Sequence, residues 1–295
     1  MPKVVEVTDL KAGKPGSLIL KDSLNLIEKN YKAAKAGGFA GIPMGIEALD
    51  HLLGGLQTGL HIVAAQPGAG KTALALNIAR HCSREGYPVV YASFDETPER
   101  LLVKIISAQT GLNAGGLFRG AISPDKFSEA AELYGHKKLN NLSFLSGINL
   151  NAADFAAQLQ DQLSESEKDT GLLVVDYLQP WSSFIAREQG IDFRQAIGQA
   201  ALQLRALANS LDIPVLVVSA QNREGQNSQR MTSLRESSDL EYSADSIMLI
   251  STNDQKIVGA NHYARTLTIA KNRFGASDET IDLLLNGKTQ EMLGG

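Results

Sequence analysis

Short apolar runs alternate with amphipathic stretches along most of this chain. The apolar runs that predict buried strands lie at residues 60–65, 88–94, 142–145, 172–175 and 215–219. Stretches with apolar residues at helical spacing lie at residues 73–79, from 97 onward, 152–163 and 193–211. Three β-rich segments at residues 246–250, 266–271 and 279–285 close the chain. This order predicts an α/β fold, with a mostly parallel twisted sheet flanked by helices and a C-terminal β-hairpin.

The first forty residues follow a different pattern. Residues 1–17 hold lysines, glycines and prolines with little periodicity, which is typical of a flexible tail. From Leu18 apolar residues recur at helical spacing with lysines between them, and this predicts a linker helix over residues 18–38. The apolar side of that helix either folds back on the core of the same chain or packs on a second subunit. We therefore expect a tail, a linker or oligomerisation helix, and one α/β domain over residues 39–295.

The most specific motif lies between the first apolar run and the helix that follows it. Residues 65–72 read Ala-Gln-Pro-Gly-Ala-Gly-Lys-Thr, the pattern of a phosphate-binding loop. Its glycines let successive backbone N–H groups face inward, and the helix start adds its positive dipole end. We expect Lys71 to reach the β- and γ-phosphates of ATP and the Thr72 hydroxyl to bind Mg²⁺. The predicted nucleotide contacts are Gln66, Pro67, Gly68, Ala69, Gly70, Lys71, Thr72 and Ala73.

Polar residues at the ends of three other strands complete this predicted site. Asp176 ends the run 172–175 and can hold Mg²⁺ opposite Thr72. Asp95 and Glu96 follow the run 88–94, where a carboxylate can polarise the water that attacks the γ-phosphate; the alternative is two solvated acids at a helix start. Residues 219–223 are either a γ-phosphate sensor or an ordinary loop.

Two cations follow a late β-rich segment. Lys271 and Arg273 precede a turn at Gly275, and we expect them on a projecting tip. Such a tip either supplies positive charge to the phosphates of another subunit, as an arginine finger does, or is solvated surface.

Two further segments are candidates for contact with a polyanion. One is a predicted loop at residues 182–192, which contains Arg187, and the other is a loop with Arg223, Arg230 and Arg235. Both follow strands, at the edge where open α/β sheets bind ligands. The alternative is that both are solvated loops.

Composition limits the functions that these motifs can serve. The formal net charge is −4, so a DNA contact must come from a local patch or from a channel built by several subunits. The single cysteine, Cys82, makes no internal disulfide, and the five histidines show no zinc-binding spacing. No apolar run approaches about 18 residues and no signal peptide is recognisable, so we expect a cytoplasmic protein without membrane contact.

Taken together, these motifs resemble the C-terminal, RecA-type motor domain of DnaB-family replicative helicases. The KaiC and RadA families share the broader core, and residues 94–98 resemble the paired-acid motif of KaiC. Residues 176–179 and 235–237 favour the helicases. The resemblance is carried by residues 41–45 with 49–50, residues 55–59, the phosphate loop, and residues 176–179, 222–223, 234–237 and 271–275.

The resemblance implies a hexameric ring that holds ATP and Mg²⁺ between subunits and single-stranded DNA in its channel. Lys71, Thr72 and Asp176 carry over as phosphate and Mg²⁺ ligands, and Lys271 and Arg273 as cations that act on the neighbouring subunit. Arg235 and Glu236 fall in the family's channel-lining motif. The helix over residues 18–38 matches the family's linker helix, which packs on the adjacent subunit. A primase or a helicase loader is a further expected partner.

The sequence departs from the family pattern in four places. The family's catalytic Glu aligns with Asp95, so either Asp95 or Glu96 has that role. Ala220 stands where the family has Gln, with Gln221 one residue late; Ser238 replaces a Gly in the channel motif; and we expect no counterpart of the family's primase-contacting domain.

The leading hypothesis is an ATP-dependent, ring-forming DNA helicase or translocase that acts on single-stranded DNA in replication. The alternatives are a KaiC- or RadA-like regulatory or recombination ATPase and a low-turnover nucleotide-binding subunit.

Overall fold

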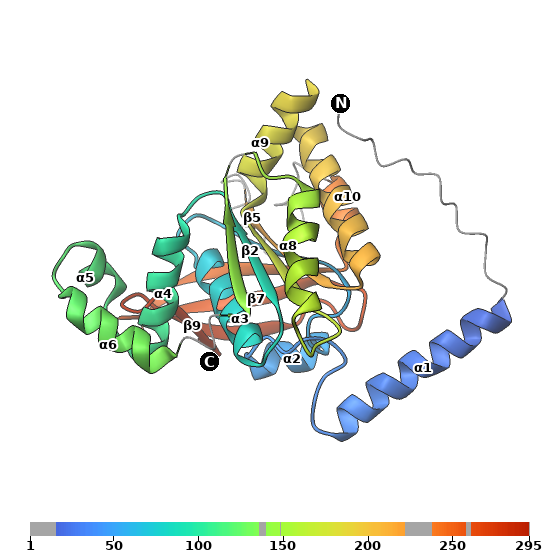
Figure 1. Cartoon of the computed structure of the whole chain (residues 1–295), viewed down its shortest axis with the longest axis horizontal. Helices are drawn as coiled ribbons and strands as arrows, with labels where there is room; N and C mark the ends of the chain where they lie inside the picture. Colours follow the sequence, from blue (N-terminus) through green and yellow to red (C-terminus); the bar gives the residue numbers. More distant parts are fainter. Residues whose placement is uncertain (1–15, 136–139, 148, 222–237, 258–260, 295) are drawn as a thin grey trace. The chain divides into compact units, whose positions relative to one another are not determined.

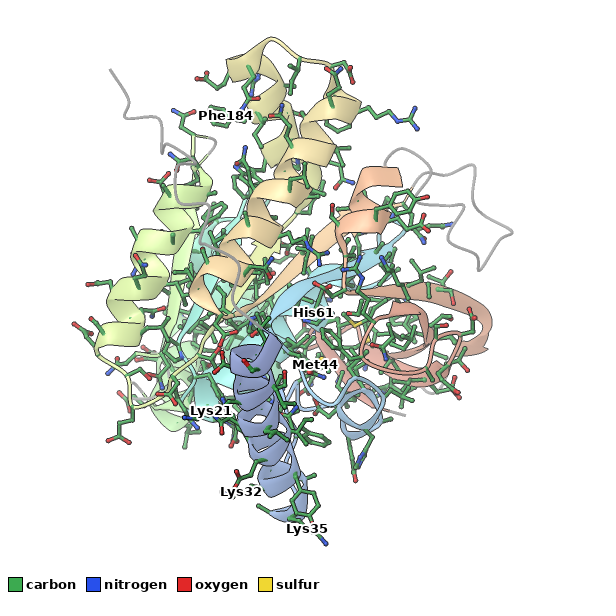
Figure 2. All side chains as sticks on the ribbon, turned by 90° about the vertical axis from the view of Figure 1, so that its right-hand side faces the viewer. Lys21, Lys32, Lys35, Met44, His61 and Phe184 are labelled. Atoms are coloured by element: carbon green, nitrogen blue, oxygen red, sulfur yellow. The ribbon has the colours of Figure 1, made fainter. Side chains whose placement is uncertain are left out.

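The computed structural model describes residues 16–135, 140–147, 149–221, 238–257 and 261–294. The chain forms two compact units, residues 1–40 and residues 41–295. In the first unit α1 (Gly16–Lys35) carries Lys21, Lys32 and Lys35 (Figure 2). Its large apolar side chains are also exposed, Ile19 at 49% and Ile27 at 63%. The helix is amphipathic in sequence, as predicted for this segment.

A nine-stranded sheet forms the second unit (Figure 1), in the order β3-β2-β4-β5-β1-β6-β7-β8-β9. The strands from β3 to β6 in this order are parallel, and β6 to β9 form an antiparallel ladder. The mostly parallel α/β sheet is confirmed, while the antiparallel part is larger than the single hairpin expected. The strands are β1 (Gly59–Ala65), β2 (Val89–Ser93), β3 (Leu142–Ser146), β4 (Leu172–Asp176), β5 (Pro214–Ala220), β6 (Ser246–Ile257), β7 (His262–Asn272), β8 (Thr280–Asn286) and β9 (Glu291–Gly294).

Helices cover both faces of the sheet (Figure 1), because successive strand residues face opposite ways. Val63 packs in one core with Leu74, and Ile62 packs in the other with Leu204. The helices of the first core are α2 (Glu47–Leu53), α3 (Lys71–Arg84), α4 (Pro98–Thr110) and α6 (Pro124–Tyr134); the short α5 (Ala114–Phe118) follows α4. Those of the second core are α8 (Ala152–Ser164), α9 (Leu178–Gln189), α10 (Phe193–Leu211) and α11 (Ser238–Ser243). No helix in the described ranges is long and apolar enough to cross a membrane.

Most of the predicted loop at residues 182–192 is helix α9, so that prediction is wrong. Leu178, Trp181 and Ile185 lie at helical spacing and are buried. Pro180 obscures the helix in the sequence, yet it falls in the first turn, where a missing N–H breaks no helical hydrogen bond. Arg187 lies in the last turn of α9 and is exposed, with Nε 3.4 Å from the Ser183 carbonyl oxygen.

The glycine-rich segment before β1 is fixed by one buried carboxylate. Asp50 accepts hydrogen bonds from the backbone N–H groups of Met44 (2.7 Å) and Gly45 (3.0 Å). A Cβ on Gly41 would lie 2.4 Å from the Leu56 carbonyl, so only glycine allows the two backbones to approach this closely. These contacts tie residues 41–56 together directly before β1 and its phosphate loop.

Candidate nucleotide-binding site

The phosphate loop connects β1 to α3, and the Lys71 side chain that follows it is half-buried. The Lys71 ammonium donates hydrogen bonds to the carbonyl oxygens of Ala65 (2.8 Å) and Gln66 (3.0 Å). Burial lowers the pKa of Lys71, and the nearby Asp176 carboxylate partly offsets that shift. The loop therefore holds its cation beside the backbone N–H groups that favour an anion.

The antiparallel part of the sheet contacts this loop and fixes its conformation. Arg265 on β7 donates from Nε to the Ala69 carbonyl oxygen at 2.9 Å. Gly70 has a φ of +104°, and a Cβ there would lie 2.6 Å from the Met292 methyl group on β9. The Asn77 amide on α3 donates to the Met292 carbonyl. The loop conformation thus depends on strands more than 190 residues away in sequence.

A pocket of about 350 Å³ opens above the loop at the carboxyl edge of the sheet. Gln66 and Ala69 of the predicted contacts do not line it; their carbonyl groups bind Lys71 and Arg265 instead. The pocket is lined by Pro67, Gly68, Gly70, Lys71, Thr72, Ala73, Asp95, Lys104, Asp176, Tyr177, Ala220, Leu285 and Gln290.

Asp176 lies at the floor of the pocket with two hydroxyl donors. The Tyr91 hydroxyl donates to its Oδ2 at 2.6 Å, and the Thr72 hydroxyl also hydrogen-bonds it. Burial raises the pKa of Asp176; the two hydroxyl groups act against that shift, and the nearby acids Glu96 and Asp95 add to it. The Asp176 side chain lies beside the phosphate loop, where the sequence predicts a carboxylate that binds Mg²⁺.

These residues fit Mg²⁺, which prefers oxygen ligands and keeps several of its waters. Thr72 and Asp176 supply a hydroxyl and a carboxylate oxygen that are already in contact. Within the described ranges no group of three or more His, Cys, Asp or Glu residues could hold a metal by itself.

The structure distinguishes between the two acids that follow β2. Asp95 lines the pocket, whereas Glu96 forms an ion pair with Lys104 of α4. The Ser93 hydroxyl fixes this turn, because it donates to the Glu96 carbonyl at 2.6 Å and accepts from the Glu96 N–H at 3.3 Å. Asp95 is thus the acid that faces the pocket, and Glu96 is neutralised beside it.

The end of β5 is held by Gln179 of α9. Its amide donates to the Ser219 hydroxyl (3.0 Å) and accepts from the Ala220 N–H (3.1 Å). Ala220 is the residue that faces the pocket, so the polar sensor side chain expected in this region is missing at that position. Gln221 lies just outside the lining, with its N–H bonded to the Ala65 carbonyl.

Lys271 and Arg273 lie at the opposite end of the strands from the phosphate loop. Asn272 pairs with Ser246, which pairs with His61 near the start of β1, whereas the loop follows the end of β1. Lys271 donates to the Glu241 carbonyl (2.7 Å), Arg273 forms an ion pair with Asp245 (2.9 Å), and residues 273–280 are exposed. The Phe274 ring lies beside the buried His61 ring, with the two centroids 6.0 Å apart.

Of the predicted nucleic-acid contacts, only Arg187 can be placed. It lies on α9 and not among the pocket-lining residues. Arg223, Arg230, Arg235 and Glu236 lie outside the described residues.

Sequence reasoning missed several residues of the site. Lys104 left a recognisable signal, a lone lysine in the apolar stretch 101–106. Tyr91 did not, because a tyrosine in a buried strand looks like ordinary core. The contact of Arg265 with the loop is long-range and leaves no local pattern.

A phosphate loop after β1 of a mostly parallel sheet, with an acid at the end of β4 and with β5 between these two strands, defines a P-loop nucleotide-binding domain of the RecA type. Residues 41–292 match the family model of the DnaB-like helicase C terminal domain. The chain therefore belongs to that family.

Known proteins agree with this assignment. The replicative DNA helicase DnaB of Geobacillus stearothermophilus is 28% identical over 261 residues, which cover 85% of this chain and 56% of the relative. A probable plasmid replicative DNA helicase of Chlamydia psittaci is 30% identical over 245 residues, 80% of this chain and 52% of the relative. The chain spans about half the length of these curated relatives.

Two solved structures share the fold. One is an isolated ATPase domain, which has a TM-score of 0.78 at 21% identity; the match covers 94% of this chain and 98% of that domain. The other is a DnaB-like replicative helicase, studied with primase, which has a TM-score of 0.76 at 20% identity; the match covers 96% of this chain and 67% of the helicase.

Proposed function

We propose that this chain is the ATP-hydrolysing motor of a DnaB-type replicative helicase and works as a ring of identical subunits on single-stranded DNA. One observation carries the proposal. The phosphate pocket and the cations Lys271 and Arg273 lie at opposite edges of one sheet, so a site containing both requires two subunits. A hexamer is the ring size that the family resemblance favours, and a replication role places the protein in the cytoplasm.

Each residue of the pocket has a role in this proposal. The loop N–H groups and Lys71 bind the phosphates of ATP, while Thr72 and Asp176 hold Mg²⁺, which neutralises phosphate charge when bound. Asp95 polarises the attacking water, because Glu96 is already paired with Lys104. Lys271 and Arg273 of the adjacent subunit stabilise the charge on the transferred phosphoryl group.

The DNA contacts in this proposal come from short segments and not from overall charge. Arg187, Arg223, Arg230, Arg235 and Glu236 line or flank the channel. The exposed apolar side of α1 packs on the adjacent subunit. A primase or a loader is a further partner, supported by the likeness to a helicase studied with primase.

The proposal is tested by the ATPase rate with and without single-stranded DNA at two salt concentrations. We expect DNA to stimulate turnover, salt to weaken the stimulation, and Arg235→Ala to abolish it. The matched control is Arg119→Ala, an exposed arginine at the end of α5, which should retain the stimulation. Turnover that is indifferent to DNA would contradict the helicase assignment and favour a regulatory ATPase.

A second experiment tests which acid is catalytic. Asp95→Asn should lower kcat by about 10²-fold or more while nucleotide affinity stays near that of the wild type. Glu96→Gln keeps the shape of a residue that is already paired, so its effect on kcat should be far smaller. The reverse order of effects would transfer the role to Glu96, and little effect from either change would indicate a low-turnover subunit.

A further inference from the structure

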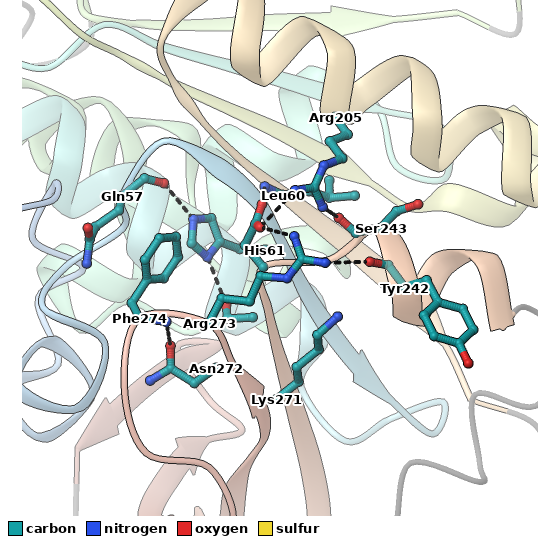
Figure 3. A network of polar contacts seen from close by, with 12 residues as sticks. Gln57, Leu60, His61, Arg205, Tyr242, Ser243, Lys271, Asn272, Arg273 and Phe274 are labelled. Carbon is teal, nitrogen blue, oxygen red and sulfur yellow. Dashed lines mark hydrogen bonds and ion pairs between the residues drawn. The ribbon is translucent and has the colours of Figure 1, made fainter. Parts of the chain in front are cut away.

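Arg273 belongs to a network that centres on one carboxylate (Figure 3). Its Nη1 donates to Asp245 Oδ1 at 2.9 Å, its Nη2 donates to the Tyr242 carbonyl at 2.9 Å, and its backbone N–H donates to the Asp245 carbonyl at 2.8 Å. The side chain is still 43% exposed. These contacts use one hydrogen of each Nη, so a guanidinium with five N–H donors keeps others for an anion.

Asp245 is in turn fixed to the strand that leads into the phosphate loop. Its Oδ2 accepts from the Leu60 N–H at 2.9 Å, and its own N–H donates to the Leu60 carbonyl at 2.7 Å. A Cβ on Gly59 would lie 2.4 Å from Oδ2, so the glycine leaves room for this carboxylate. The Asp245 side chain is only 10% exposed. These contacts hold the Asp245 carboxylate in one orientation, in which Oδ2 faces Leu60 and Oδ1 faces Arg273.

A second arginine adjusts the charge of the network. Arg205 of α10 donates to the same Asp245 Oδ1 at 3.2 Å and also to the Ser243 carbonyl. Without Arg205, the negative charge of Asp245 would cancel much of the positive charge of Arg273. Two cations, Arg205 and Arg273, share the Asp245 carboxylate, and a third, Lys271, donates to the Glu241 carbonyl. Positive charge therefore remains at this edge.

We infer that Asp245 and Arg205 are positioning residues for Arg273. Asp245, which is hydrogen-bonded to Leu60 of β1, sets the direction of the Arg273 guanidinium, and Arg205 keeps Asp245 from neutralising the charge of Arg273. The inference rests on the proposed function, in which Arg273 acts on the nucleotide of the adjacent subunit. A long side chain fixed before the reaction does not have to be ordered during it. The cost of releasing Arg273 should therefore appear in kcat and not in the binding of ATP to the subunit's own loop.

The experiment compares Asp245→Asn, Arg273→Ala and the double variant with the wild type. We expect Asp245→Asn to lower kcat by about 10-fold or more, because an amide keeps an acceptor but loses the charge that aligns Arg273. The double variant should be no slower than Arg273→Ala. Arg205→Met should lower kcat in the same way, and the nucleotide affinity of each oligomer should stay within about 3-fold.

The matched control is Asp212→Asn. Asp212 is also an aspartate at this edge of the sheet, where its carboxylate accepts from the Thr58 hydroxyl at 2.7 Å. Its φ of +53° is one that asparagine adopts readily, so the backbone should tolerate the change. This variant should keep wild-type kcat.

The outcomes separate the inference from the proposed function. If Arg273→Ala leaves kcat unchanged, the proposed action on the adjacent subunit fails. If Arg273→Ala abolishes turnover while Asp245→Asn does not slow it, only the positioning role fails. A multiplicative loss in the double variant, or parallel losses of thermal stability and nucleotide affinity in Asp245→Asn, would show a structural ion pair and overturn the inference.

Discussion

The hydrogen bond from Tyr91 to Asp176 should contribute measurably to the stability of the fold. Tyr91→Phe removes the hydroxyl that donates to Asp176 at 2.6 Å and keeps the ring. That ring is fully buried and packs beside Phe144, with the two centroids 5.9 Å apart. The change therefore tests one polar contact in a buried setting without opening a cavity.

A hydrogen bond to a charged acceptor contributes about 1.5–3 kcal/mol, so Tyr91→Phe should lower the free energy of unfolding by about that amount near neutral pH. The loss should depend on pH. Burial raises the pKa of Asp176, and the variant raises it further because a bond that favours the ionised form is gone. The difference in stability is full above the folded-state pKa values of both proteins and shrinks as pH falls through them.

Urea unfolding of the wild type, Tyr91→Phe, Asp176→Asn and the double variant measures this contribution. Near neutral pH we expect a coupling between the two positions of about 1 kcal/mol or more, which decreases at low pH. Nucleotide binding gives a second readout: Tyr91→Phe should weaken it only when Mg²⁺ is present. Additive stability losses that do not change with pH would refute the reasoning.

Three further predictions concern His61, Gly70 and the ion pair of Lys104 with Glu96. Burial lowers the pKa of His61, so the unfolded state binds a proton more readily than the folded state. Below about pH 6.5 the wild type should therefore lose up to about 1.4 kcal/mol of unfolding free energy per pH unit relative to His61→Gln. Urea unfolding measures this, and an equal dependence of the unfolding free energy on pH in the two proteins would contradict it. Gly70→Ala should cost about 0.5–1.5 kcal/mol more than Gly68→Ala, since both have positive φ but only a Cβ at Gly70 would displace a side-chain end, the Met292 methyl group; equal unfolding midpoints would refute it. Lys104→Met should weaken ATP affinity about 10-fold by leaving Glu96 unpaired near the phosphates, and adding Glu96→Gln should restore most of it in equilibrium binding.

The elements closest to the pocket could be predicted from local pattern alone. The apolar run before residue 65, the glycines, and the acids that end β2 and β4 are all local features, and parallel strands bring their carboxyl ends to one edge. Helix α9 could not be read in this way, because a proline and two serines in its first half resemble a loop. The contacts of the tip at residues 271–275 could not be predicted either, since a local pattern cannot show that Asp245 accepts from Arg273.

The sequence by itself determined the class of site: Lys71 and Thr72 after a strand, with Asp176 ending another, specify phosphate and cation chemistry because that chemistry depends on residue type and local backbone. Only the tertiary structure decided which acid faces the pocket, since the pairing of Glu96 with Lys104 depends on how α4 packs. It also decided that Arg273 lies at the far edge from its own pocket, because strand order and direction are set by packing across the whole sheet. Contacts between residues far apart in sequence leave no periodic signal, and here they determine how the site is completed.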